Sequence, residues 1–401
     1  MIPITRRVSK SEALTGGCIV ARTVMHIADF TTPHSGGFIA CLSTLGVYGG
    51  KEGWRFIFVF PAAAQTTSWA AQLSQNGYKL YFLPPRAPLL KVTNIIREIA
   101  LKEQANIIHT HFSNFNIPGC LAALQLRWEK RTVKVVWHFH SDWRIQLTFL
   151  RRIKDFILYN ILGRFTYGIS VAEHIKENMI SRGMQRQRMF FVPNGIDMDR
   201  IQSRADSTCI RQELGIAADK IVFLIFGWEP ITKGVDLVLE AFEMLSRQYK
   251  NTTLLLVGTE MMNNYVAARE NGEAPEWLVL AAPRAQVAEY YKASDVFISA
   301  SRSEGFPYSV AEAMGAKLPV ISSDIPGVAW AKHAKGVLLF ESGNSTALFQ
   351  AIQGALSWSE QELQDRKRSN HQFIVENYTV EKWAKNIIDV YKMIQSDDEN
   401  L

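Results

Sequence analysis

Short apolar segments rich in Val, Ile, Leu and Phe alternate with segments of helical period along the whole chain. Continuous apolar runs of this kind indicate strands that are buried on both faces, as in parallel sheets. The alternation of strand and helix predicts right-handed βαβ units, and therefore an α/β fold with doubly wound parallel sheets. Thirteen segments have this strand composition: 22–28, 55–60, 78–83, 106–111, 133–139, 167–172, 188–193, 220–227, 252–258, 276–282, 295–300, 318–323 and 336–340.

The length and the charge distribution both indicate two domains. A chain of 401 residues exceeds what one hydrophobic core commonly serves. Residues 1–200 contain 25 Lys and Arg against 12 Asp and Glu, a net charge of +13, whereas residues 201–401 contain 19 against 26, a net charge of −7. The two halves therefore differ electrostatically.

Turn-forming residues interrupt the pattern near Pro193, Asn194 and Gly195. We predict a first Rossmann-like domain over residues 1–197 and a second over residues 198–378. A final segment, 379–396, has large apolar residues at helical spacing, which predicts an amphipathic helix that packs in a groove.

Several classes of protein are disfavoured by composition. No apolar run reaches the length of roughly 18 residues that a membrane span needs, and the N-terminal segment lacks the apolar core of a signal peptide. The four cysteines form no CxxC pair, which suits a reducing compartment and a cytoplasmic location. The basic first half favours an anionic membrane surface or acceptor as its partner, and so a peripheral position on the inner face of the membrane. No nucleic-acid-binding motif accompanies the charge.

Two glutamates flank a turn in "SRSEGFPYSVAEAMGAKLPVISSDIPG" (301–327). Glu304 follows the predicted strand 295–300 and precedes a helix whose first turn is expected to include Pro307. The backbone N–H groups of Gly305 and Phe306 are expected at the positive end of that helix, where they suit a phosphate or a sugar hydroxyl. Glu312 lies inside the helix among apolar neighbours, so its carboxylate needs a partner.

This stretch closely resembles the E-x7-E signature of the retaining glycosyltransferases of family four, which have the GT-B fold of two Rossmann-like domains facing a cleft. Three further segments resemble the family in order along the chain: "SVAEHIKENMISRGMQRQRMFFVPNGID" (170–197) its interdomain segment, "FGWEPITKGVDLVLEAF" (226–242) its donor loop, and "FIVENYTVEKWAKNIIDVYKMI" (373–394) its closing helices. The last of these implies a C-terminal helix that crosses back to the first domain.

The resemblance implies roles in donor binding. Glu312 would accept hydrogen bonds from the two ribose hydroxyls of a nucleotide, and Glu304 would hold hydroxyls of the donor sugar, because ionised acceptors form the stronger hydrogen bonds. Lys233 would contact the diphosphate and neutralise the charge of the leaving nucleotide. Many relatives have an arginine where this chain has Trp228, which could stack on the nucleotide or pack against the protein.

In the first half, Gly36 and Gly37 follow the first strand and would let the backbone approach the diphosphate. Two His-x-His pairs, His109 with His111 and His138 with His140, lie at strand ends, so each pair is expected on one face of its strand. Four imidazoles at strand ends could surround a metal, which keeps a His-based metal hydrolase as an alternative.

Under the resemblance, His140 and its neighbour Ser141 align with the active-site histidine and its hydroxyl neighbour, and His111 aligns with a histidine at the preceding strand end. The two remaining histidines of these pairs are expected to be structural. Asp197 and Asp199 form a D-x-D triplet in the interdomain connection, where a turn explains the first aspartate, so we predict no metal and no cofactor.

Basic and large apolar residues are mixed in segment 143–165, "WRIQLTFLRRIKDFILYNILGRF". This composition is typical of a helix that lies in the plane of an anionic membrane interface. A helix packed on the first sheet with a solvated basic face is the other interpretation, and the sequence leaves both open.

Together these observations predict a retaining glycosyltransferase. It would move a sugar from a nucleotide diphosphate sugar, with UDP favoured, to a saccharide or lipid-linked saccharide acceptor in surface polysaccharide or glycoconjugate synthesis. His140, Glu304 and Lys233 are the expected catalytic residues. A nucleotide-sugar epimerase of the same fold is the alternative that shares these motifs.

Overall fold

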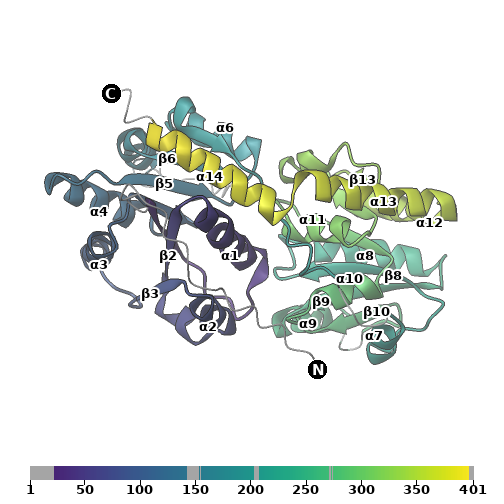
Figure 1. The fold of residues 1–401 in the computed structure, drawn as a ribbon. Coiled ribbons are helices and arrows are strands. Elements are labelled where there is room, and N and C mark those ends of the chain that lie inside the picture. Colours follow the sequence, from purple (N-terminus) through teal and green to yellow (C-terminus); the bar gives the residue numbers. More distant parts are fainter. Residues whose placement is uncertain are drawn as a thin grey trace.

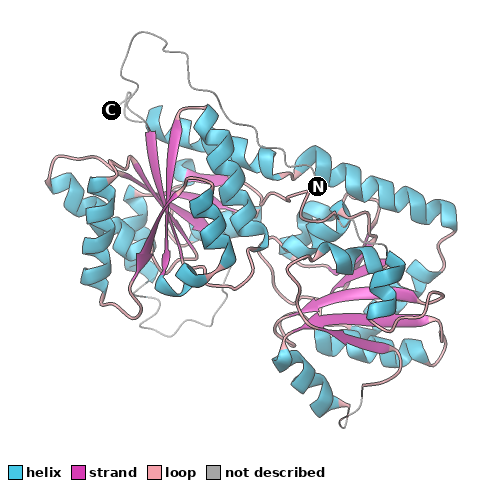
Figure 2. Cartoon of the chain, turned by 60° about the horizontal axis from the view of Figure 1, so that its bottom comes forward, coloured by secondary structure: helices cyan, strands magenta, loops and turns pink. Residues whose placement is uncertain are grey.

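The computed structural model describes residues 22–141, 153, 155–202, 207–270, 272 and 274–396. They form two Rossmann-like domains, each built on one parallel sheet with helices on both faces (Figures 1 and 2). The predicted α/β, GT-B architecture is therefore confirmed.

The first sheet has seven parallel strands in the order β3-β2-β1-β4-β5-β6-β7. Its strands are β1 (Arg22–Ala28), β2 (Trp54–Pro61), β3 (Lys79–Leu83), β4 (Ile107–His111), β5 (Lys134–Phe139), β6 (Tyr167–Ser170) and β7 (Met189–Phe191). The helices between them are α1 (Gly36–Lys51), η1 (Ala62–Thr66), α2 (Ser68–Gln75), α3 (Leu89–Lys102), α4 (Asn116–Trp128), η2 (Ile157–Ile161), η3 (Leu162–Phe165), α6 (Glu173–Ser181) and η4 (Arg186–Arg188).

The second sheet has six parallel strands in the order β10-β9-β8-β11-β12-β13. Its strands are β8 (Ile221–Gly227), β9 (Thr252–Gly258), β10 (Leu278–Ala281), β11 (Val296–Ser299), β12 (Val320–Ser323) and β13 (Val337–Phe340). Its helices are α7 (Ser207–Glu213), α8 (Val235–Ser246), α9 (Glu260–Arg269), α10 (Ala288–Ala293), α11 (Tyr308–Gly315), η5 (Pro326–Ala331), α12 (Ser345–Leu356) and α13 (Glu360–Asn377).

All thirteen predicted strands are present, with ends that differ by at most two residues. Their central residues are almost completely buried, as in Ile57 of β2 and Leu255 of β9. Helices cover both faces of each sheet, which explains why the strands are continuous apolar runs and not alternating ones.

The last helix, α14 (Val380–Ser396), crosses from the second domain back to the first and packs on α1 (Figure 1). The crossing begins where the Ile196 N–H donates to the Tyr378 carbonyl at 2.7 Å and the Val380 N–H donates to the Ile196 carbonyl at 3.1 Å. Lys392 forms an ion pair with Glu52 at 2.9 Å. The predicted C-terminal helix and its return to the first domain are confirmed.

Segment 143–165 differs from the single amphipathic helix that was expected. Residues 142–152 and 154 lie outside the described part. From Ile157 onward the chain forms a π-helical turn and then a 3-10 turn, in which the position of Gly163 packs against the Met184 side chain. Phe156 and Phe165 are each 61% exposed, whereas Tyr159 is buried and its ring contacts Trp137 and Phe139 of β5. One side of the described turns therefore packs on the sheet and the other side faces solvent. Within the described residues, no helix is long and apolar enough to cross a membrane.

Candidate active site

A cavity of about 660 Å³ lies between the two domains. Its lining follows the carboxyl ends of β5, β8, β11 and β12, where open α/β sheets bind their ligands. The first domain contributes His140, Ser141 and His174, and the second contributes Trp228, Glu229, Thr232, Lys233, Arg302, Ser303, Glu304, Gly305, Phe306, Ile325 and Pro326. The three predicted catalytic residues, His140, Glu304 and Lys233, therefore line one cavity.

Lys233 and Glu304 form an ion pair at the wall of this cavity. Lys233 Nζ lies 2.6 Å from Glu304 Oε1, which also accepts a hydrogen bond of 2.8 Å from the Ser301 hydroxyl. Gly234 follows the lysine with φ of +67°, and a Cβ there would collide with the Ala300 carbonyl oxygen. The glycine therefore lets the donor loop approach the end of β11, which brings the lysine to the glutamate.

Glu304 retains capacity for a further hydrogen bond. Both of its contacts use Oε1, and among the described residues none bonds to Oε2. Because an ionised carboxylate accepts strong hydrogen bonds, this oxygen can take a ligand hydroxyl while Lys233 keeps its charge paired.

Gly305 brings the second domain against the first. A Cβ at this position would collide with the carbonyl oxygen of His140, so the two backbones touch at the edge of the cavity. Pro307 is the N-cap of α11, which begins at Tyr308, and the expectation that Pro307 lies in the first turn is wrong by one residue. Its ψ of 106° is extended, as is typical of an N-cap residue.

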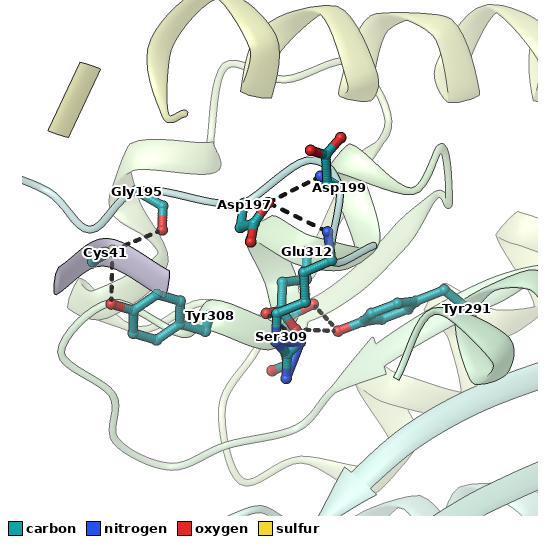
Figure 3. Close-up of polar contacts among 9 residues, drawn as sticks. Cys41, Gly195, Asp197, Asp199, Tyr291, Tyr308, Ser309 and Glu312 are labelled. Atoms are coloured by element: carbon teal, nitrogen blue, oxygen red, sulfur yellow. Dashed lines mark hydrogen bonds and ion pairs between the residues drawn. The ribbon is translucent and has the colours of Figure 1, made fainter. Parts of the chain in front are cut away.

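Glu312 is only 6% exposed and is held by two protein groups, of which Figure 3 shows Tyr291. Its Oε1 lies 3.2 Å from Arg200 Nη1, and its Oε2 accepts a hydrogen bond of 2.9 Å from the Tyr291 hydroxyl. Burial raises the pKa of this carboxyl, while the charge of Arg200 opposes the rise. Glu312 does not line the cavity, so its contact with a ribose diol stays a prediction.

Arg200 belongs to the interdomain connection. The Asp197 carboxylate accepts from the Asp199 and Arg200 backbone N–H groups at 3.0 and 3.3 Å (Figure 3). This is the turn that the sequence predicted for Asp197. It places the Arg200 side chain on α11, where Ile201 also packs against Gly315.

The two glycines of the first domain are not brought to the cavity. Gly36 begins α1 with φ of +56°, and Gly37 packs under the Tyr308 ring, whose atoms would lie 2.6 Å from a Cβ there. Tyr308 OH also lies 3.8 Å from Cys41 Sγ (Figure 3). Gly37 therefore serves a contact between the domains here, and the predicted approach of both glycines to a diphosphate stays a prediction.

His140 is half-buried, and burial lowers its pKa to about 3. Its Nε2 lies 3.0 Å from Nδ1 of His111, which is fully buried behind it. His26 on β1 belongs to the same cluster, and the sequence analysis did not predict it. It is an isolated histidine in the sequence and lies beside the other histidines only because β1 pairs with β4 in a register that places it opposite His109.

Two groups of three histidines in this cluster have ring nitrogens within 4.8 Å of one another: His26, His109 and His111, and His111, His138 and His140. These are the described residues that could hold a metal. Their ring nitrogens already contact one another in pairs at 2.9, 3.0 and 3.2 Å, and no carboxylate or cysteine is in either group. A metal ion bound by either group would have to replace these contacts between histidines, and the predicted absence of a metal stays a prediction.

Arg302 and His174 line the cavity and were not predicted. Arg302 forms a bidentate pair with Asp236 at 2.7 and 2.8 Å, which holds a second cation beside the cavity. The strand-end rule that selected Glu304 also applies to Arg302, two residues earlier. Trp228 is 44% exposed at the cavity wall, so it is not buried in the core, and its ring lies parallel to that of Phe226 with ring centroids 6.4 Å apart.

Two family profiles match the chain in sequence. Residues 45–200 match the family described as "Glycosyltransferase Family 4", and residues 206–372 match "Glycosyl transferases group 1". Together they span both domains and include the donor loop, the E-x7-E stretch and the interdomain segment.

Individual relatives agree with these profiles. The chain is 24% identical to the GPI3 subunit of phosphatidylinositol N-acetylglucosaminyltransferase of Saccharomyces cerevisiae, over 80% of this chain and 72% of that protein. It is 23% identical to N-acetyl-alpha-D-glucosaminyl L-malate synthase of Bacillus anthracis, over 82% and 85%. Its fold is similar to that of Anabaena HepE in complex with UDP, with a TM-score of 0.76, 17% identity and coverage of 92% and 100%. The chain belongs to the glycosyltransferases of family four.

Proposed function

We propose that this glycosyltransferase takes a UDP-sugar as its donor, binds it in the cavity between the domains, and transfers the sugar with retention at the anomeric carbon. The observation that carries the proposal is the Lys233–Glu304 pair of 2.6 Å at the cavity wall. One group of this pair is a cation suited to a diphosphate, and the other is an acceptor suited to sugar hydroxyls. The UDP complex of HepE, which has a similar fold, supports uridine as the base.

We propose a same-face transfer, which needs no nucleophilic carboxylate beneath the sugar. The bond between the anomeric carbon and the diphosphate oxygen breaks, the acceptor oxygen bonds to that carbon on the same face, and the acceptor proton passes to the departing diphosphate oxygen. The protein then needs to position the reactants and stabilise the charge that develops on the diphosphate. Lys233 and the positive end of α11 supply that stabilisation. Arg302 adds a nearby positive charge, although Asp236 pairs with it.

The acceptor is proposed to be a saccharide or a lipid-linked saccharide that enters from the first domain. The names of two relatives support this class: one acts on phosphatidylinositol, and a Streptococcus pneumoniae relative, 21% identical over 54% of this chain, is an alpha-galactosylglucosyldiacylglycerol synthase. Both names refer to lipid products or acceptors.

A surface of the first domain supports a peripheral position on an anionic membrane. Four apolar side chains lie exposed on and beside the turns before β6: Phe156, Ile157, Ile161 and Phe165. Phe165 also lines a second pocket, of about 310 Å³, together with Arg127, Lys134 and Arg188. Apolar side chains beside cations are the combination that binds the interface of an anionic bilayer. We call Phe156, Ile157, Ile161 and Phe165 the apolar patch.

A donor screen tests the proposal. The protein is incubated with UDP-, GDP- and ADP-sugars and with candidate acceptors, and the release of nucleoside diphosphate and of product is measured. We expect release that depends on both a UDP-sugar and an acceptor. A new sugar nucleotide that forms without any acceptor would instead support the epimerase, and failure of every nucleotide to bind at millimolar concentration would refute the donor site.

A further inference from the structure

Five histidines and one tyrosine form a continuous hydrogen-bonded chain from the cavity into the core. In order from the cavity, the contacts join His140 Nε2 to His111 Nδ1 (3.0 Å), His111 Nε2 to His26 Nδ1 (2.9 Å), His26 Nε2 to the Tyr391 hydroxyl (3.1 Å), that hydroxyl to His109 Nδ1 (2.5 Å), and His109 Nε2 to His138 Nδ1 (3.2 Å). We call these six residues the histidine–tyrosine chain.

The histidine–tyrosine chain lies on one face of the first sheet, under α1 and α14. The histidines come from β1 and β4 and from the end of β5, whereas Tyr391 comes from α14, the helix that returns from the second domain. Tyr391 is completely buried, and among the described residues its hydroxyl is the only hydrogen-bonding group that joins His26, His111 and His140 to His109 and His138. The C-terminal helix is thus hydrogen-bonded, through two histidines, to the residue at the cavity wall.

All five imidazoles are neutral near neutral pH. Burial lowers the pKa of His26 and of His140 to about 3, and it lowers those of the other three well below the usual range. A neutral imidazole has one N–H donor and one acceptor nitrogen, and a tyrosine hydroxyl has one donor proton. Each contact needs one donor and one acceptor, so the contacts on each side of Tyr391 run in one direction. The Tyr391 hydroxyl could accept from both neighbouring histidines, but its own buried proton would then have no acceptor among the described residues. It therefore donates to one histidine and accepts from the other, and all contacts run in the same direction.

The far end of the chain decides between the two directions. His138 Nε2 is buried and has no hydrogen-bond partner within the part of the chain that the structure describes. If the donors pointed inward from the cavity, this nitrogen would carry a buried proton with no acceptor. If they point outward, it is a bare acceptor, which is the better tolerated of the two buried defects. Outward donation requires every one of the five histidines to be protonated at Nδ1 and not at Nε2.

We infer that the histidine–tyrosine chain fixes His140 as a hydrogen-bond donor toward the cavity, with its proton on Nδ1. His140 Nε2 accepts from His111, so Nδ1 is the ring nitrogen left for a ligand. Among the described residues, no group beyond His138 Nε2 can accept or supply a proton, so the histidine–tyrosine chain orients His140 and does not conduct protons. His140 then cannot act as a base toward the acceptor, and Tyr391 and the other four histidines are positioning residues.

The tautomers can be read directly. Long-range ¹H–¹⁵N correlation spectra of the full-length, histidine-labelled protein separate protonated from bare ring nitrogens. The protein has nine histidines. Single substitutions assign the signals of the four that lie outside the histidine–tyrosine chain: His34, His174, His333 and His371. We expect the remaining five all to be protonated at Nδ1. Five protonated at Nε2, a mixture of tautomers, or a stoichiometric metal bound by these rings would overturn the inference.

Tyr391→Phe provides an internal control. It removes the hydroxyl that joins His26 to His109. One N–H of the His109–His138 pair is then unpaired whichever of the two histidines donates to the other, so these two histidines lose their fixed tautomer. His26, His111 and His140 keep Nδ1–H, because outward donation still avoids an orphan donor. Tyr78→Phe, which removes a hydroxyl that donates to the Ser43 carbonyl outside the chain, should change none of the five. Loss of the fixed tautomer at His140 in Tyr391→Phe, or at any of the five in Tyr78→Phe, would contradict the inference.

Kinetics tests the donor role itself, and this arm rests on the proposed function. A glutamine amide can donate a hydrogen bond but cannot accept a proton as a base. We therefore expect His140→Gln to keep turnover within about tenfold of the wild type and His140→Leu to lose at least about tenfold more. Equal loss in both variants would overturn the donor role. The spectra need no substrate, so they test the tautomers independently of activity. A protein without transferase activity would refute the proposed function but would not change the result of the spectra.

Discussion

Nη1 of Arg200 lies 3.2 Å from Oε1 of Glu312, so the interdomain connection is tied to the helix that carries the E-x7-E stretch. Ribose hydroxyls that bind Glu312 must share this carboxylate with Arg200 or displace it. Nucleotide binding and the position of the interdomain connection are therefore coupled through one side chain.

The first prediction concerns the pH dependence of UDP binding. Burial raises the pKa of Glu312, and the ionised form is the better acceptor for a diol. UDP affinity should therefore be highest above this pKa and fall as the pH drops through it. The charge of Arg200 opposes the rise, so in Arg200→Leu the fall should begin at a higher pH. Calorimetric titrations between about pH 5 and about pH 8 measure both curves.

The matched control is Glu312→Gln, which keeps the shape of the side chain but cannot titrate. It should bind UDP about 10- to 100-fold more weakly, as expected for the loss of hydrogen bonds to a charged group. It should also lack the part of the acid-side fall that Glu312 causes, and keep the part that protonation of the terminal UDP phosphate, with a pKa of about 6, adds. If the variant keeps the wild-type pH curve, Glu312 is not the group that contacts the nucleotide.

Lys233→Met should lower kcat by about 10²- to 10³-fold, because the charge that develops on the leaving diphosphate loses its nearest cation. The fold should persist, since the lysine is partly exposed. Lys220→Met removes a lysine of the same domain whose Nζ donates to the Lys250 carbonyl and which does not line the cavity, and it should leave kcat unchanged. Equal rates for Lys233→Met and wild type would remove the lysine from the mechanism.

Glu304→Gln should separate binding of the nucleotide from turnover. Its free Oε2 is proposed to hold the sugar, so UDP should bind within about threefold of the wild-type affinity while transfer from the UDP-sugar falls by about 10²-fold. Titration with UDP and single-turnover transfer measure the two effects. A loss of UDP affinity as large as the loss of turnover would place Glu304 at the nucleotide instead.

Gly305→Ala should impair the contact between the domains, because its Cβ would collide with the His140 carbonyl oxygen. We expect kcat/KM to fall by at least about tenfold while thermal stability changes by less than about 2 °C. Gly354→Ala in α12 is the control, since a Cβ there meets nothing within 4 Å. That variant should keep activity and gain about 0.5–1 kcal/mol of stability. Full activity in Gly305→Ala would show that the contact is not needed.

The apolar patch should bind anionic vesicles. Replacing Phe156 and Phe165 with serine should reduce sedimentation with phosphatidylglycerol vesicles by about tenfold, because burial of two aromatic rings is lost. Val47→Ser removes an exposed apolar side chain of α1 outside the patch and should have no effect. Binding that survives the double substitution would assign the membrane contact to another surface.

The sequence predicted the strands and several cavity residues for the same reason. Parallel strands are buried on both faces, so they are visible as apolar runs, and ligands collect at their carboxyl ends. That rule located Glu304 and placed His140 at a strand end, whereas Lys233 was assigned by the resemblance to the family; all three line the cavity.

What the sequence did not predict depends on contacts between segments that are far apart in the chain. Arg200 reaches Glu312 only because the interdomain turn at Asp197 is folded onto α11. Tyr308 covers Gly37 only when the domains meet, and His26 joins the other histidines only through strand pairing. The sequence around each of these residues contains no motif that indicates its partner.

The central claim is that the cavity lined by Lys233 and Glu304 binds the nucleotide sugar. The most direct test is a calorimetric titration of UDP into the wild-type protein and into Lys233→Met. The account predicts one UDP site per chain in the wild type and an affinity at least about tenfold lower in the variant. No UDP binding to the wild type, or equal affinity in the two proteins, would contradict it.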